Sequence, residues 1–103
     1  MTFEKKINDL IFLLNNKQYS QLIFKIESSF EDIEINSQVL LILGLARMKL
    51  RSGNLEDVSL AIEDFKKGYN LDKNSKIGLE CLICYLHGLY EKIKQKKSLS
   101  LDE

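Results

Sequence analysis

The stretch AIEDFKKGYNLDKN, residues 61–74, carries the clearest structural pattern in this sequence. Ala61, Phe65 and Gly68 recur at intervals of four and three residues, which places them on one face of an α-helix. The polar residues 72–75 that follow are typical of a turn. The stretch therefore predicts a helix and its exit into a turn.

Hydrophobic residues recur at helical spacing along the rest of the chain as well. Interruptions at 15–16, 36–37, 52–54 and 72–75 divide the pattern into five predicted helices. Asn36-Ser37 and Asn54 provide capping residues before two of them. Residues 39–50 are apolar nearly all round, as expected of a helix buried between neighbours. The stripes predicted to face the core in the other four helices are Phe3, Ile7, Leu10, Ile11 and Leu14; Tyr19, Leu22, Ile23, Ile26, Phe30 and Ile33; Val58, Ala61, Ile62, Phe65, Gly68 and Tyr69; and Leu79, Leu82, Leu86, Leu89, Tyr90 and Ile93.

The composition agrees with an all-α fold. The 103 residues include no proline and only five glycines, and both residue types are unfavourable inside helices. A chain of this length forms one compact domain with a core of its own. We therefore expect a single all-α domain of antiparallel helix hairpins over residues 1–97, followed by a polar C-terminal tail at 98–103.

Residues 61–74 resemble the second helix and exit turn of a tetratricopeptide repeat (TPR). That family has a small residue, an aromatic residue four positions later and another small residue three positions after that. Ala61, Phe65 and Gly68 take these places, and Lys73 stands where proline is usual. The resemblance implies hairpins stacked as a short TPR-like superhelix of about five helices, in which neighbouring repeats bury each other's apolar faces.

The segment before this stretch fits the same family. Leu40, Leu43 and Gly44 match positions of the first helix of a repeat, where Gly44 would let the two helices of a hairpin approach closely. One departure is the connection from Arg51 to Leu60, which is about five residues longer than the usual hairpin turn. The resemblance is specific from about Ser37 to Asn74 and weaker elsewhere.

In the family, the first helix of each repeat lines a concave surface that binds extended peptides or helices. Carried over to this chain, the resemblance implies a groove whose main partner-binding residues are Asn8, Phe12, Gln38, Leu41, Leu45, Met48, Cys84 and His87, with Lys5, Asn15, Ile42, Lys49, Ile77 and Glu80 beside them. The clamp that holds a peptide carboxylate in some family members is missing, because Phe12, Ile42 and Glu80 occupy its positions. The groove is mainly apolar, which suits an amphipathic helix or a segment of the same polypeptide. Alternatively, these residues pack against one another or against the fifth helix.

Charge and hydropathy argue against nucleic acid and membrane as partners. Fifteen basic residues balance fifteen acidic ones, whereas nucleic-acid binders usually carry a basic excess. The longest apolar stretch, Val39 to Ala46, is far shorter than the roughly 20 residues that span a bilayer. Two cysteines in one apolar stretch do not indicate a secreted disulfide framework. We expect a cytoplasmic protein.

Cys81, Cys84 and His87 are the residues that could carry chemistry. A redox cysteine pair needs its nucleophile near a helix N-terminus, and this pair lies well inside a predicted helix. A zinc site needs about four ligands, and His87 is the only histidine in the chain. We therefore expect buried cysteines that act as small apolar residues, no cofactor and no enzymatic activity.

Three functions remain open at this point. The first is a small adaptor or scaffold that binds a protein segment through the apolar groove. The second is a catalytically silent accessory domain of a larger enzyme, such as a glycosyl-, sulfo- or methyltransferase. The third is a structural homodimer, because about two and a half repeats leave apolar surface on the fifth helix uncovered.

Overall fold

The computed structural model describes residues 2–50 and 55–101, with side chains for 2–50 and 56–96. Over these residues the chain is all-helical and contains no strand, which confirms the predicted fold class. The elements are α1 (Phe3–Asn15), α2 (Tyr19–Ser29), the short 3₁₀ helix η1 (Asp32–Glu34), α3 (Ser37–Leu50), α4 (Leu55–Leu71) and α5 (Lys76–Leu101).

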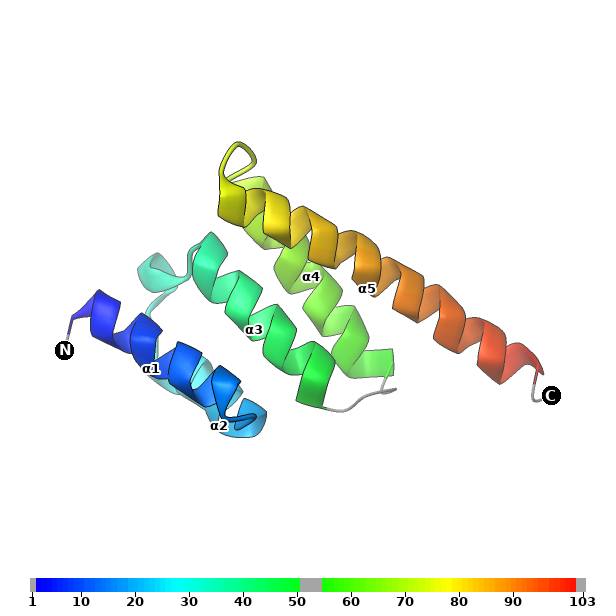
Figure 1. Ribbon diagram of the computed structural model, residues 1–103, viewed down its shortest axis with the longest axis horizontal. Helices are drawn as coiled ribbons and strands as arrows, with labels where there is room; N and C mark the ends of the chain where they lie inside the picture. Colours follow the sequence, from blue (N-terminus) through cyan, green and yellow to red (C-terminus); the bar gives the residue numbers. More distant parts are fainter. Residues whose placement is uncertain (1, 51–54, 102–103) are drawn as a thin grey trace.

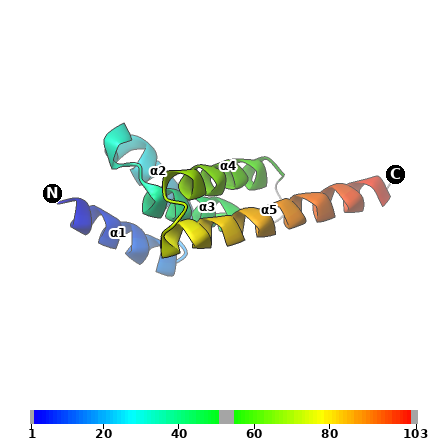
Figure 2. The same cartoon turned by 90° about the horizontal axis from the view of Figure 1, so that it is seen from above.

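Neighbouring helices pack side by side as antiparallel pairs (Figure 1). The most extensive contacts join α3 to α4 and α4 to α5, and α3 also contacts α2 and α5. Seen from above, α2 and α4 lie towards one side of the molecule, whereas α1 and α5 lie towards the other (Figure 2). The arrangement resembles a helical repeat, with α5 at one edge and the α1–α2 pair at the opposite edge.

Polar side chains fix where the helices begin. The Thr2 hydroxyl accepts a hydrogen bond from the Lys5 backbone N–H (3.2 Å) at the start of α1. Asn36 Oδ1 accepts one from the Val39 N–H (3.0 Å) before α3, and Ser75 Oγ accepts one from the Gly78 N–H (2.9 Å) before α5. Each satisfies a backbone donor that has no partner inside its helix. The predicted cap at Asn36 is thus confirmed, whereas Asn54 lies outside the described residues.

The core consists of two clusters that meet at α3. The first joins α1, α2 and α3 through Ile7, Leu10, Leu22, Ile26, Val39, Ile42, Leu43 and Ala46. The second joins α3, α4 and α5 through Leu41, Ala61, Phe65 and Cys81. Because α3 contributes to both clusters, it is buried on most of its circumference, as its nearly uniform apolar sequence predicted.

Glycines allow the helices of the second cluster to approach closely. A methyl group at Gly44 would overlap the Phe65 ring, as expected for a close hairpin contact. A methyl group at Gly68 would lie 2.7 Å from Cys81 Sγ, and one at Gly88 would lie 2.8 Å from Ile62 Cγ1. These separations are shorter than van der Waals contact, so each glycine keeps two helices closer together than alanine would allow.

An ion-pair network across α2, α3 and α4 was not predicted. Arg47 Nη1 lies 2.7 Å from Asp64 Oδ2, and Arg47 Nη2 lies 3.4 Å from Glu27 Oε1. Asp64 is only 6% exposed, and burial raises the pKa of its carboxyl to about 6 although Arg47 opposes the rise. Its position was detectable in the sequence, because Asp64 lies on the same helical face as Ala61 and Gly68.

Two boundaries differ from the sequence-based expectation. The resemblance to the repeat family placed a connection from Arg51 to Leu60, but α4 begins at Leu55, as the break at 52–54 and the stripe from Val58 predicted; its acidic first turn (Glu56 and Asp57) suits a helix N-terminus. Ile33 was assigned to a core stripe, but it is 90% exposed in η1. The reason is that Glu34 pairs with Lys6 on α1 at 3.0 Å, which fixes η1 with Ile33 directed outwards.

The predicted core stripe of the fifth helix was wrong for four of its six members, whereas Leu82 and Leu89 are half-buried. Leu79 is 51% exposed, Leu86 55% and Ile93 57%. The buried face of α5 consists instead of Gly78, Cys81 and Gly88. Small residues occupy the buried face of α5 because α4 and the turn before α5 lie so close to it that larger side chains would clash with them. In addition, α5 continues to Leu101, so residues 98–101 of the expected tail are helical.

Candidate protein-binding groove

A hollow of about 280 Å³ lies between α3 and α5, with α4 at its base. Its described lining comprises Leu45, Met48 and Lys49 from α3, Phe65 from α4, and Cys84 and His87 from α5. All of these except Phe65 are residues that the sequence placed on the concave surface. Residues almost forty positions apart in the chain are thus brought to one place.

The hollow is apolar within and polar at its rim. Leu45, Met48 and Cys84 are partly buried and pack against the cluster around Phe65, which is itself fully buried. Lys49 and His87 are exposed, one on each flanking helix. Methionine and cysteine side chains are polarizable, and methionine adapts its shape to different apolar surfaces. The hollow can therefore accept an apolar side chain while its rim contacts polar groups beside it.

Other residues predicted for the groove lie elsewhere. Leu41 is 9% exposed within the second core cluster, and Ile42 is 5% exposed within the first, so both belong to the interior. Gln38 is half-buried near the start of α3. Ile42 is covered by α1 and α2, whose side chains complete the first cluster. Leu41 is covered because α4 and α5 pack on α3, where Cys81 donates a long S–H hydrogen bond to the Ser37 carbonyl (3.8 Å).

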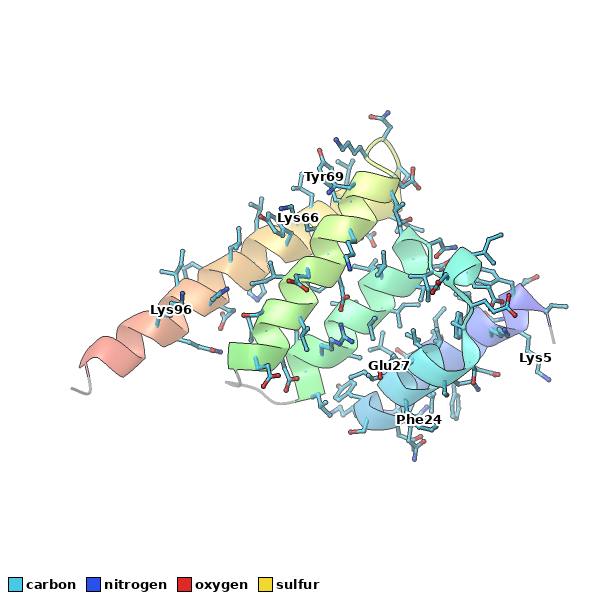
Figure 3. All side chains as sticks on the ribbon, turned by 180° about the vertical axis from the view of Figure 1, so that it is seen from behind. Lys5, Phe24, Glu27, Lys66, Tyr69 and Lys96 are labelled. Atoms are coloured by element: carbon cyan, nitrogen blue, oxygen red, sulfur yellow. The ribbon has the colours of Figure 1, made fainter. Side chains whose placement is uncertain are left out.

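The residues predicted on α1 do not join the hollow. Asn8 is exposed, and Phe12 is 63% exposed. Neither belongs to the described lining between α3 and α5. Lys5 projects from the outer side of α1, away from α3 to α5 (Figure 3). Asn15 is exposed at the end of α1, whereas Ile77 is half-buried and Glu80 exposed near the start of α5.

The two cysteines have the properties of structural thiols. Both are free, and Cys81 is fully buried. Burial raises the pKa of the Cys81 thiol to about 11, and burial also raises the pKa of Cys84. Both thiols are therefore protonated at neutral pH. Nucleophilic and redox-active cysteines have the opposite shift, because the thiolate is the reactive form.

Two further findings concern the described residues as a whole. Nowhere among them do three His, Cys, Asp or Glu side chains come together as metal ligands would. No helix within the described ranges combines the length and apolar character needed to cross a bilayer.

A second hollow was not predicted. It measures about 470 Å³ and lies between η1, the start of α3 and the end of α4, lined by Asp32, Ile35, Leu40, Lys67, Asn70 and Leu71. Its lining mixes charged and apolar side chains from segments that carry no shared motif. Only the folding of η1 against the end of α4 brings them together, so no pattern in the sequence could have indicated it.

Comparison of this sequence and structure with known proteins found no match. The sequence matches no family model, and neither curated proteins nor solved structures give a match to it. The function therefore has to be inferred from the groove and the exposed surfaces of this chain.

Proposed function

We propose that this protein is a non-catalytic interaction module that holds an apolar segment of a partner protein in the groove between α3 and α5. One observation carries the proposal: Leu45, Met48, Lys49, Cys84 and His87, named from repeat spacing alone, line one hollow. The occupant that suits it best is one face of an amphipathic helix, because such a helix presents apolar side chains flanked by polar ones.

The proposal also covers the family to which the helix hairpins are related and the cellular compartment of the protein. The hairpins would be related to tetratricopeptide repeats, whose first helices line the binding surface, and α3 and α5 would correspond to those first helices. The location would be the cytoplasm, where the free thiols of Cys81 and Cys84 stay reduced. The raised pKa of both thiols supports a non-catalytic role, because it makes them poor nucleophiles.

A selection of displayed amphipathic-helix peptides tests this function. Peptides that bind the wild-type chain should perturb the NMR signals of Met48, Lys49 and Cys84 most strongly. Met48→Glu and Lys49→Glu place a negative charge in the hollow and at its rim, and each should weaken binding about tenfold or more. Lys49 is exposed, so its substitution leaves the core intact.

Phe24→Glu is the matched control, because Phe24 is 71% exposed on α2 (Figure 3) and does not belong to the lining of the groove. It should leave peptide affinity unchanged. Circular dichroism should show the same helix content for all variants. The proposal would be refuted if the selected peptides perturbed NMR signals of the protein on another surface. It would also be refuted if the peptides bound both groove variants as tightly as the wild type.

A further inference from the structure

The outward side of α5 carries an uncovered apolar stripe, here called the outer stripe, which consists of Leu79, Ile83, Leu86, Tyr90 and Ile93. Their exposed fractions are 51%, 66%, 55%, 61% and 57%. No element in the part of the chain that the structure describes packs on them. Single exposed apolar residues are ordinary on protein surfaces, but a continuous row of them marks an interaction surface.

The outer stripe has the spacing of a coiled-coil seam. Its members follow one another at intervals of four, three, four and three residues, which is the heptad alternation of core positions in two paired helices. The opposite side of α5, with Gly78, Cys81 and Gly88, is already buried in the domain. Helix α5 therefore has one face for its own fold and a second face patterned for another helix.

We propose that the outer stripe binds the outer stripe of a second copy of this chain, with the two α5 helices antiparallel. Charge decides the orientation. Glu80 and Lys94 flank the stripe on the same edge, two heptads apart, and both are exposed. In antiparallel coiled coils like edges meet, so Glu80 of each copy faces Lys94 of the other, and symmetry forms this pair twice.

The other edge of the stripe agrees with this orientation. It carries Leu82 and Leu89, both half-buried, and Lys96. In the antiparallel pair Leu89 meets Leu89 of the second copy, and the aliphatic stem of Lys96 covers Leu82 of the second copy. In a parallel pair the two unlike edges would meet instead, and neither Glu80 nor Lys94 would find an opposite charge.

Helix length and position fit the same register. These contacts centre the pair on Gly88, the middle of α5 (Lys76–Leu101), so that the two helices overlap over nearly their whole length. An overlap of about 25 residues corresponds to roughly 37 Å of paired helix, of which the apolar stripe from Leu79 to Ile93 covers about 21 Å. Helix α5 forms one edge of the molecule, and its C-terminal half extends beyond α4 (Figure 1). A second helix can therefore approach the stripe without meeting α1 to α4.

Analytical ultracentrifugation of the full chain over a range of concentrations tests the dimer. The wild-type chain should pass from monomer to dimer with rising concentration. Ile83→Glu buries a charge in the seam of both copies and should weaken the dimer about a hundredfold. Phe24→Glu, which changes an equally exposed apolar residue on α2, should dimerise like the wild type. Circular dichroism verifies that both variants stay folded.

A charge exchange tests the orientation. Glu80→Lys alone should weaken the dimer roughly three- to tenfold, because it turns two attractive pairs into repulsive ones. Adding Lys94→Glu should restore wild-type affinity. A wild-type chain that stays monomeric up to about 1 mM, or a dimer that Ile83→Glu leaves intact, would overturn the proposal. A double variant no better than Glu80→Lys would overturn the antiparallel arrangement.

This inference does not rest on the proposed groove function, because none of the five stripe residues lines the hollow. The two surfaces adjoin at His87, which lies at the rim of the hollow and, on the stripe edge, between Glu80 and Lys94. Ile83→Glu should weaken the dimer about a hundredfold without changing the affinity of the monomer for groove peptides. Conversely, Met48→Glu should weaken peptide binding in a chain that still dimerises. The failure of either proposal can therefore be recognised separately.

Discussion

Replacing Arg47 by methionine should destabilise the protein, and the loss should depend strongly on pH. The substitution keeps much of the aliphatic bulk but removes the guanidinium that pairs with the nearly buried Asp64 at 2.7 Å. Asp64 then has no charged partner at that distance. Removing one member of a buried pair is generally more costly than removing both, because it leaves a charge without compensation.

The magnitude follows from the pKa of Asp64, which burial raises to about 6 in the wild-type chain. Between its ordinary value of 3.8 and about 6, the folded chain holds a proton that the unfolded chain has released. Stability therefore falls as the pH rises through this window. Without Arg47 the pKa rises further. Arg47 is the largest influence that lowers this pKa in the wild-type chain. Each further unit of rise lowers the stability above the new pKa by about 1.4 kcal/mol, so a rise of about one and a half units corresponds to a loss of roughly 2 kcal/mol.

Urea denaturation followed by circular dichroism measures this effect. At about pH 7.5, Arg47→Met should lose roughly 2 kcal/mol beyond any loss from packing, whereas at about pH 5 Asp64 is largely protonated in both chains and only the packing loss remains. Glu27→Gln is the control, because Glu27 is the exposed partner of Arg47 at 3.4 Å and should contribute under about 1 kcal/mol. An equal loss at both pH values would refute the assignment of a raised pKa to Asp64.

Two further predictions concern the second core cluster. Gly44→Ala should lower the free energy of unfolding by about 1–3 kcal/mol, because its methyl group would overlap the Phe65 ring; Ala substitution at exposed Ser20 on α2 serves as the control in the same urea titration. Maleimide should label Cys84 before Cys81 in the folded chain, because Cys81 is fully buried. Mass spectrometry of the single variants Cys81→Ser and Cys84→Ser measures the two labelling rates separately, and the difference between them should disappear in denaturant. Unchanged stability in the first case, or equal labelling rates in the second, would contradict the packing described here.

The groove was only partly predictable from the sequence. Repeat spacing named Leu45, Met48 and His87, which do line one hollow. The same reasoning named Leu41, which is buried in the core, and Phe12, which does not reach the hollow. Spacing within a helix gives the direction of a side chain, but its exposure depends on how closely the next helix packs, and that distance is not encoded in any one helix.

The sequence by itself determined that the chain is all-helical, where most helices begin and end, and that α3 is buried on most sides. These properties are local, because capping side chains, glycine, proline and the spacing of apolar residues act within a few turns of each helix. Only the tertiary structure decided which face of α5 is buried. Gly78, Cys81 and Gly88 carry little hydrophobic signal, yet they take the interior because close packing on α4 excludes the larger side chains. The apolar stripe that the sequence assigned to the core is therefore on the surface, free to meet another helix.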